Sequence, residues 1–473
     1  MLNASIQTVL AAAACVLLFL AIRKLLRNGN APAAILAAGV FVRAIGGQLA
    51  FWISYLELPV GRGLQLGRGL WFYASDGQGY FNHAVVGAER GLGAIFSLDP
   101  SVISPGFTQV LALFAYLFGS VVSTALLLNL AAYLGTCAIV IALAGQQKRL
   151  ATIAVAAISF SPSSILWSTQ PLKDVFFLFL FAAFAGVVAM WIKAWHREER
   201  PFVRAVLMTL LMLAVLCTIA AIRWYFALAL LLISAPVLAA ASLRTRMPLR
   251  ALALLVAMYA VVLAGAIAVA GPFFPARISK LILSPDLATV ARAPGAFADT
   301  LKGVRFAFDR QPGNTQIEPG PAVSGMPAAR FVSGSAVFVL PRLVTRPAGL
   351  ADMKGGRGLW LFADVDTIFF DVFLLIAIVA LVRAKWRNPL LWLVAGITLF
   401  FAAAFVYSIG NFGALFRYRS MIFLGVVLIP VVAAWPYPAF LKLPARLDGV
   451  AVGVQRDRAA MPGDLRELGT EAE

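Results

Sequence analysis

The stretch DVFFLFLFAAFAGVVAMWI, residues 174–192, decides the fold class of this chain. After Asp174 it holds eighteen residues without a charge, and an α-helix of that length and composition can cross the hydrocarbon core of a bilayer. The whole chain of 473 residues is 62% hydrophobic and 13% charged, against roughly half apolar residues in soluble domains. This composition excludes a soluble globular protein and predicts an all-α polytopic membrane protein.

Ten further charge-poor stretches flank this one, so the sequence predicts eleven transmembrane helices. Residues 106–144 are too long for one span and awkward for two. We therefore expect the segment 106–119 to lie as a helix at the outer membrane interface. The other ten spans are predicted at 5–22, 31–57, 121–144, 150–168, 205–224, 226–243, 251–271, 362–382, 389–409 and 419–441.

The distribution of basic residues predicts the orientation of these spans. If the N-terminus lies outside, the short loops on the cytoplasmic side hold fifteen Lys and Arg residues, as the positive-inside rule requires. The net charge of +18 then reflects topology, and no nucleic-acid partner is expected. The sequence thus predicts a multi-pass protein of a bacterial inner membrane with a cytoplasmic C-terminus.

The predicted spans divide the chain into one membrane domain, residues 1–441, and a short tail. The domain carries two long outer loops, 58–106 and 272–361, and the second is too long for the positive-inside rule to govern. The tail, residues 442–473, has mixed charge and few apolar residues, which is typical of a disordered cytoplasmic end.

Cysteine and histidine give no sign of a metal centre or a disulfide framework. Cys15, Cys137 and Cys217 all lie inside apolar runs, without paired spacing or a neighbouring histidine. The two histidines, His83 and His196, are too few for a histidine-rich centre. We therefore predict no metal ligands among the site residues.

Eight charged residues from five parts of the chain are predicted to meet at the outer membrane surface. A charge at membrane depth is costly, so each is a candidate for function. The alternative for each is an interfacial ion pair or an arginine that reaches the lipid headgroups. Arg43 lies in mid-span and is expected either to pair with Asp371 or to line the same cavity from below. The eight are Asp76, Lys173, Asp174, Arg223, Asp364, Asp366, Arg417 and Arg419.

These residue types in an outward-facing cavity favour the transfer of a sugar from a lipid phosphate. Arginine binds phosphate oxygens in pairs and lysine adds a point charge. A carboxylate above them can take the proton of an acceptor hydroxyl if it lies within hydrogen-bond reach. The cations would also stabilise the departing phosphate.

Three segments resemble the GT-C superfamily of membrane glycosyltransferases and related bacterial polysaccharide-synthesis proteins. WFYASDGQGYFNHAVVGAERG (71–91) resembles the first extracytoplasmic loop of that family, with its aspartate ahead of a helix of small residues. SPSSILWSTQPLKDVFFLFLF (161–181) resembles its proline-containing outer turn, and FRYRSMIFLGVVLIP (416–430) the arginine-rich start of a late helix. The resemblance extends over residues 70–435 in organisation.

The resemblance implies roles for particular residues. Asp76 would be the catalytic base, and the cations Lys173, Arg223, Arg417 and Arg419 would bind the lipid phosphate. Many family members carry two adjacent acidic residues in the first loop, whereas Gly77 and Gln78 follow Asp76 here. A divalent cation, Mg²⁺ or Mn²⁺, is therefore the one cofactor left open.

Further substrate contacts are expected from Tyr80 and from the acidic residues Asp174, Asp364 and Asp366. The ring of Tyr80 could support a sugar, and the alternative is membership of the aromatic belt at the membrane interface. His83 is expected to be structural.

The leading hypothesis is a hexosyl- or pentosyltransferase that moves a sugar from a polyprenyl-phosphate carrier to a glycan, lipid or protein on the outer face. The first alternative is a polymerase or ligase that joins whole lipid-linked oligosaccharides. The second is a flippase for lipid-linked glycans or another transporter. A transporter is expected to show charges throughout the membrane depth and internal repeats, neither of which dominates this sequence.

Overall fold

The structure of the protein is a computed structural model with two units, Met1–Trp435 and Pro436–Glu473. The fold described below is that of the first unit. Most of the predicted outer loop 272–361 and all of the predicted tail 442–473 lie outside the described residues. The structure describes residues 2–26, 30–97, 102, 104–197, 201–244, 253–261, 264, 335, 338–339, 356–384, 388–408 and 412–435.

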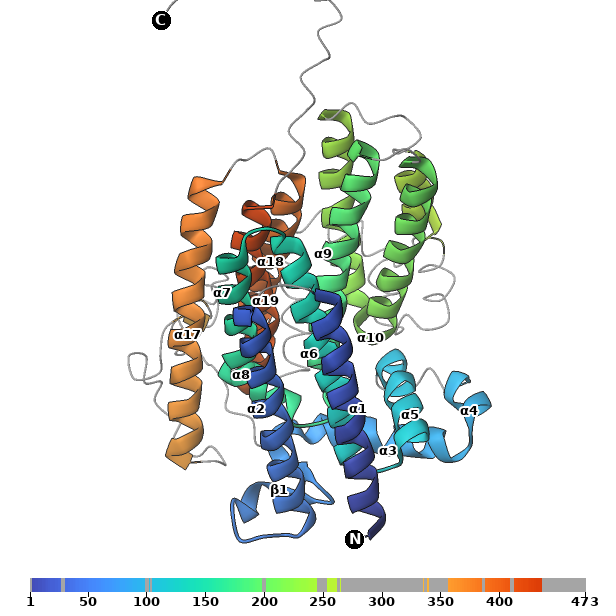
Figure 1. Cartoon of the computed structure of the whole chain (residues 1–473), viewed down its shortest axis with the longest axis vertical. Helices are drawn as coiled ribbons and strands as arrows, with labels where there is room; N and C mark the ends of the chain where they lie inside the picture. Colours follow the sequence, from blue (N-terminus) through green and yellow to red (C-terminus); the bar gives the residue numbers. More distant parts are fainter. Residues whose placement is uncertain are drawn as a thin grey trace, which may run out of the picture. The chain divides into compact units, whose positions relative to one another are not determined.

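The described chain is a bundle of helices with one small hairpin (Figure 1). At the end of the bundle where the N-terminus lies, the helix α2 leads into the hairpin of β1 and β2. The helices are α1 (Leu2–Leu26), α2 (Asn30–Tyr55), α3 (Ser75–Glu89), α4 (Leu92–Phe96), α5 (Pro105–Phe118), α6 (Val122–Ala144), α7 (Lys148–Phe160), α8 (Pro162–Ser168), α9 (Lys173–Arg197), α10 (Pro201–Arg244), α17 (Gly356–Arg383), α18 (Pro389–Ser408) and α19 (Phe412–Ala433).

Seven of the described helices are long and apolar enough to cross a membrane, or eight if one bent pair forms a single span. The prediction of an all-α polytopic membrane protein is confirmed. The predicted number of eleven spans stays a prediction. The predicted span 251–271 lies largely outside the described residues, and Phe226–Ala240 is a shorter apolar helix. The seven are Ala31–Tyr55, Val122–Ala144, Lys173–Trp195, Phe202–Arg223, Phe362–Arg383, Pro389–Val406 and Phe416–Ala433.

The predicted continuous span 150–168 is instead broken into α7 and α8, which meet at an angle of 55°. Pro162 is the first residue of α8 and disfavours helical backbone at the residue before it. Ser161 accordingly adopts φ −58° and ψ 119°, and its hydroxyl accepts a hydrogen bond from the amide of Ser164. The capped break replaces the single helix that the apolar sequence suggests.

The helix α10 is interrupted at Arg223, whose backbone has φ −149° and ψ 82°. The interruption lies where the sequence predicts the turn between the spans 205–224 and 226–243. The backbone on both sides remains helical, so the chain bends at Arg223 instead of forming a loop.

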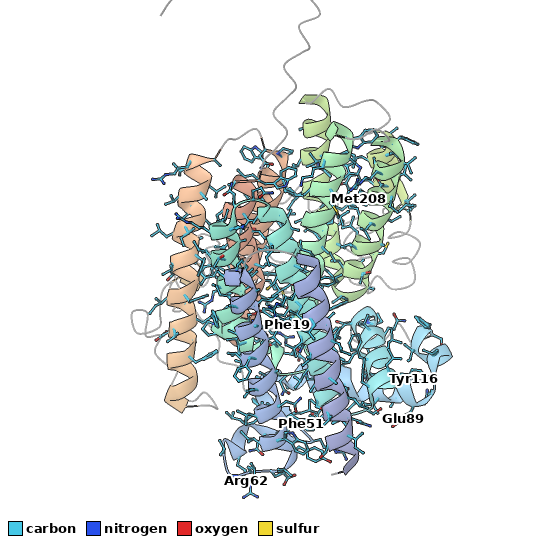
Figure 2. The ribbon with its side chains drawn as sticks, in the orientation of Figure 1. Phe19, Phe51, Arg62, Glu89, Tyr116 and Met208 are labelled. Atoms are coloured by element: carbon cyan, nitrogen blue, oxygen red, sulfur yellow. The ribbon has the colours of Figure 1, made fainter. Side chains whose placement is uncertain are left out.

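The predicted outer loop 58–106 has its own secondary structure. The strands β1 (Gln65–Gly67) and β2 (Leu70–Trp71) pair antiparallel, and short 3₁₀ turns precede and follow them. A Cβ atom on Gly69, which has φ +88°, would collide with the ring of Phe51 at the end of α2. Figure 2 shows Phe51 near this end of α2, and Arg62 in the hairpin region. The hairpin is thereby closely packed on α2.

Helix α5 occupies the segment 106–119 that the sequence places at the interface. It has fourteen residues, which is too short for a span, and it packs against α3, α6 and α10. Its inner face, with Phe107 and Leu111, is buried. The interfacial assignment stays a prediction, but α5 and α3 together form a compact layer beside the bundle.

The helices α9 and α19 form the centre of the bundle. Their apolar windows are 72% and 78% buried, whereas that of α17 is 22% buried. A helix that is apolar on all sides and buried belongs in a core, and an exposed apolar helix faces lipid in a membrane protein. Most residues of α9 and α19 therefore lie between other helices.

Candidate functional site

Four charged residues form a continuous chain of ion pairs across four helices. The Arg223 guanidinium of α10 donates to Oδ1 of Asp174 on α9 at 2.5 Å. Arg417 of α19 donates from Nε to Oδ2 of the same carboxylate at 2.6 Å. It also donates from Nη1 to Oδ2 of Asp76 on α3 at 2.7 Å. The structure thus brings together residues separated by 341 positions in the sequence.

Exposure rises steadily along this chain of ion pairs. The side chains of Asp174 and Arg223 are 1% and 2% exposed, that of Arg417 is 16% exposed, and that of Asp76 is 56% exposed. A buried carboxylate needs charged partners because desolvation of a lone charge is costly, and Asp174 has two. Asp76 is therefore the end of the chain of ion pairs that solvent can reach.

The bend at Arg223 directs its guanidinium into an aromatic shell. Its central carbon lies 4.9 Å from the ring centroid of Tyr418, and 5.7 Å from those of Phe177 and Phe226. Aromatic faces attract cations, so the shell and Asp174 together hold Arg223 in place.

Lys173 extends the cluster towards α5 and α3. Its ammonium donates to Oγ of Ser104 at 2.5 Å and lies 5.2 Å from the ring centroid of Tyr80. Burial raises the pKa of Tyr80 to about 12, so its phenol is neutral at ordinary pH. Tyr80 can support Lys173 or donate a hydrogen bond, but it cannot act as a base near neutral pH.

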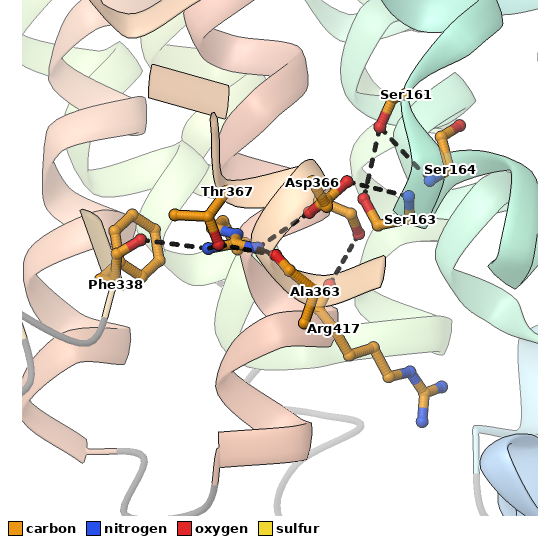
Figure 3. Close-up of polar contacts among 10 residues, drawn as sticks. Ser161, Ser163, Ser164, Phe338, Ala363, Asp366, Thr367 and Arg417 are labelled. Atoms are coloured by element: carbon orange, nitrogen blue, oxygen red, sulfur yellow. Dashed lines mark hydrogen bonds and ion pairs between the residues drawn. The ribbon is translucent and has the colours of Figure 1, made fainter. Parts of the chain in front are cut away.

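Arg419 belongs to a second, separate group. Its Nη2 atom donates to Oδ2 of Asp366 at 2.9 Å, and its Nη1 atom donates to Oγ1 of Thr367 at 2.7 Å. The other oxygen of Asp366 accepts from the amide of Ser163, the second residue of α8, at 2.9 Å. Figure 3 shows these bonds, with Arg417 pointing away from them. We name Asp366, Arg419, Thr367 and Ser163 the inner polar group.

The two arginines of α19 face opposite ways because they are two residues apart. Successive helical residues are rotated by about 100°, so residues i and i+2 do not share a face. Asp364 is 4% exposed and acts on Arg419 by its charge. Asp364, Asp366 and Arg419 therefore lie with the inner polar group, and their predicted role in substrate binding stays a prediction.

Arg43 fills the break between α7 and α8. It donates to the carbonyl oxygens of Ser159 and Ile158 at 2.6 and 2.8 Å, and to Oγ of Ser164 at 3.0 Å. Carbonyls at the end of a helix attract a cation. Within the described part of the chain Arg43 forms no ion pair with Asp371, so that predicted pairing is wrong.

The segment before Asp76 is anchored to the end of α8 by polar contacts that the sequence reading did not single out. The hydroxyl of Tyr73 bonds that of Thr169 at 2.8 Å, and the amide of Trp71 donates to the side chain of Gln170 at 3.2 Å. Asn129 of α6 donates to the carbonyl of Gln170 at 2.6 Å. The signal in the sequence is the polar run Ser168–Gln170 within an apolar region.

An apolar cluster under the site joins the same elements. Ala74 packs with Trp167 and Leu172, and with Ala363 of α17 and Phe416 of α19. Ala74 lies two residues before Asp76, and Phe416 lies directly before Arg417. The packing therefore sets the position of the two partners of the outermost ion pair.

The glycine after Asp76 packs against protein. A Cβ atom on Gly77 would lie 3.3 Å from Cγ of Pro171. The absence of a side chain thus allows α3 to approach the turn between α8 and α9, which brings Asp76 close to α9.

The site does not have the composition of a divalent-cation site. Among the described residues, no group of three or more His, Cys, Asp or Glu side chains lies close enough to hold a metal ion. The partner of Asp76 is an arginine, where Mg²⁺ or Mn²⁺ would need a second oxygen donor.

Comparison with known proteins identifies no relative of this chain. No protein-family model matches it, and neither a curated protein nor a solved structure is similar to it. The function of the chain must therefore be inferred from the geometry of its charged residues.

Proposed function

We propose that the protein is a membrane glycosyltransferase that takes a sugar from a polyprenyl-phosphate donor and attaches it to a glycan, lipid or protein on the extracytoplasmic face. The observation that carries the proposal is the ion-pair chain that begins at exposed Asp76 and continues through Arg417 to buried Asp174. It combines a solvent-accessible carboxylate with arginine nitrogens that lie towards the buried end of the same chain of ion pairs.

In this proposal Asp76 accepts the proton of the acceptor hydroxyl. Lys173, Arg223 and Arg417 stabilise the negative charge that develops on the departing lipid phosphate. The ring of Tyr80 supports Lys173, with 5.2 Å between its centroid and the ammonium nitrogen. Asp174 keeps the two arginines in place because it binds both of them.

The charge of the site favours a monophosphate donor over a diphosphate. Lys173, Arg223 and Arg417 stand against one buried carboxylate, Asp174, so the site carries at most two positive charges when Asp76 is left aside. A lipid monophosphate as leaving group carries about −1.5 to −2, which at most two positive charges can balance. A diphosphate leaving group carries more negative charge than the site compensates. This favours a single-sugar donor over the lipid-linked oligosaccharide used by a polymerase or ligase.

The broken span α7–α8 supports a second candidate, a transporter of lipid-linked glycans. Interrupted helices form the substrate and ion sites of many transporters. Here, however, Arg43 occupies the carbonyl end of the break and Asp366 bonds the amide end. With protein side chains on both ends, the break is better suited to a fixed bend than to a site that fills and empties.

The test is sugar transfer by purified protein in detergent, where no gradient exists. The donors are radiolabelled undecaprenyl-phosphate hexoses and pentoses and one undecaprenyl-diphosphate oligosaccharide, with a membrane glycolipid extract as acceptor. We expect transfer from a monophosphate donor, and its loss in the Asp76→Asn variant.

The matched control is Glu89→Gln, which removes an exposed carboxylate from the same helix (Figure 2). This variant should keep full activity. Transfer by Asp76→Asn at the wild-type rate would remove Asp76 as the base. Absence of transfer from every donor, together with glycolipid movement across vesicles, would favour the transporter.

A further inference from the structure

Arg417 uses different nitrogen atoms for its two carboxylate partners. Nε and one terminal nitrogen face Oδ2 of Asp174, at 2.6 and 2.5 Å, while Nη1 alone faces Asp76, at 2.7 Å. A guanidinium has separate donors in a fixed plane, so one partner can leave while the other remains. Arg417 can therefore exchange Asp76 for another anion without leaving Asp174.

The two ends of Arg417 differ in how firmly they are held. Asp174 is 1% exposed and also bonded to Arg223, and removing a partner from such a buried pair is strongly unfavourable. Asp76 is 56% exposed, and Arg417 is its polar partner among the described residues. An ion pair at the surface contributes little, whereas a broken buried pair is costly. The pair with Asp76 is thus the one that an incoming anion can replace.

We infer that Arg417 is shared between Asp76 and the phosphate of the donor, so that donor binding frees the Asp76 carboxylate to act on the acceptor. The inference rests on the proposed function and adds an order of events to it: the donor binds first, and the freed Asp76 then acts on the acceptor. Before the donor binds, one oxygen of Asp76 is occupied by Arg417. When a phosphate oxygen takes Nη1, both carboxylate oxygens become available to a hydroxyl group.

The reaction then balances without a further reactant. The acceptor O–H proton moves to Asp76, a bond forms between the acceptor oxygen and the anomeric carbon, and the bond from that carbon to the lipid phosphate oxygen breaks. The bonding electron pair leaves with the lipid phosphate, beside Lys173 and Arg417. When Asp76 has passed its proton to water, it competes again for Arg417 and helps to expel the lipid phosphate.

Competition for one arginine has a measurable consequence. If Asp76 and the phosphate exclude each other from Nη1, neutralising Asp76 removes the competitor. A variant that loses catalysis should therefore bind the lipid phosphate more tightly. A carboxylate that only touches the acceptor would not produce this effect.

The experiment measures binding of undecaprenyl phosphate, without a sugar, to the purified full-length protein in nanodiscs. We expect Asp76→Asn to bind up to about five-fold more tightly than wild type, the equivalent of an exposed ion pair. Asp76→Ala should show the same gain in binding. Because alanine has no side-chain donor, this variant excludes a hydrogen bond from the asparagine amide as the cause of the gain. The control Glu89→Gln should bind as wild type does.

A second pair of variants separates sharing of Arg417 from the general removal of negative charge. In an Arg417→Gln background the lipid binds more weakly, and Asp76→Asn should then give no further gain. A gain of the same size in that background would overturn the inference, as would equal or weaker binding by Asp76→Asn alone, or no binding by wild type.

Failure of the proposed function gives a different result. Tighter binding by Asp76→Asn with no sugar transfer by wild type from any donor would refute the glycosyltransferase and retain the shared arginine. Transfer by wild type with unchanged binding by Asp76→Asn would retain the glycosyltransferase and refute the shared arginine.

Discussion

Replacement of Asp366 by leucine should destabilise the protein by about 3 kcal/mol. Removing one partner of a buried ion pair costs about 3–5 kcal/mol because the other charge is left buried. Arg419 is 3% exposed and would keep its bonds to Thr367 and to the carbonyl of Phe338. The amide of Ser163 also loses its acceptor. The retained contacts place the expected loss at the lower end of the range.

The assay is equilibrium unfolding of the purified protein in mixed detergent micelles, followed by tryptophan fluorescence. The decisive comparison is the double variant Asp366→Leu with Arg419→Met. It removes both charges, and apolar replacement of a whole buried pair is often neutral. We expect the double variant to recover part of the lost stability, because no charge is left buried but the amide of Ser163 still lacks its acceptor, while Glu89→Gln remains unchanged. A loss below about 1 kcal/mol in the single variant, or a double variant less stable than the single one, would refute the reasoning.

Three further results are expected. Arg43→Met should lower the free energy of unfolding by about 1–3 kcal/mol in the same assay, because the carbonyl of Ser159 and its neighbours lose a charged donor; unchanged unfolding would contradict this. Gly77→Leu should reduce kcat for sugar transfer more than donor binding, since its side chain would press on Pro171, whereas equal loss of both would indicate general misfolding. Tyr80→Phe should leave the pH–rate profile unchanged below about pH 10, because a phenol with a pKa of about 12 stays protonated there, and a shifted alkaline limb would show that Tyr80 titrates in turnover.

The sequence predicts well wherever a long apolar run decides the structure. The predicted span 174–192 lies within α9, and 121–144 corresponds to α6 (Val122–Ala144). The sequence also predicts that Asp76, Asp174 and Arg417 share a location. Two turns separated by an even number of spans lie on the same membrane face, and two separated by an odd number lie on opposite faces. Alternation of spans thus brings distant residues to one surface before any contact is known.

Contacts with backbone atoms are the part that the sequence could not predict. One of the two expectations for Arg43 was a pair with the Asp371 carboxylate, whereas its actual acceptors include the carbonyls of Ile158 and Ser159. Every residue has a carbonyl, so no residue type marks these acceptors. They become available only because the helix ends at Phe160, inside the stretch 150–168 that the sequence predicts as one continuous span.

The separation of Arg417 from Arg419 could have been predicted from spacing. Two residues along a helix correspond to a rotation of about 200°, so both arginines cannot face one phosphate. Membrane depth alone places both arginines at one surface, whereas the rotation places them on different faces of the same helix.

The two arginines of α19 differ in whether their ion pairs can exchange partners, and the burial of each pair explains the difference. Arg419 lies where neither it nor Asp366 reaches solvent, so this pair cannot exchange partners without stranding a charge and is suited to fixing α8. Helix α8 begins at a bond to Asp366 and is followed by Thr169 and Gln170, which anchor the segment before Asp76. The fixed pair thus supports the position of a carboxylate whose own ion pair, with Arg417, is exposed enough to exchange. A rigid support and a replaceable partner on opposite faces of one helix allow Asp76 to change its contact without changing its place.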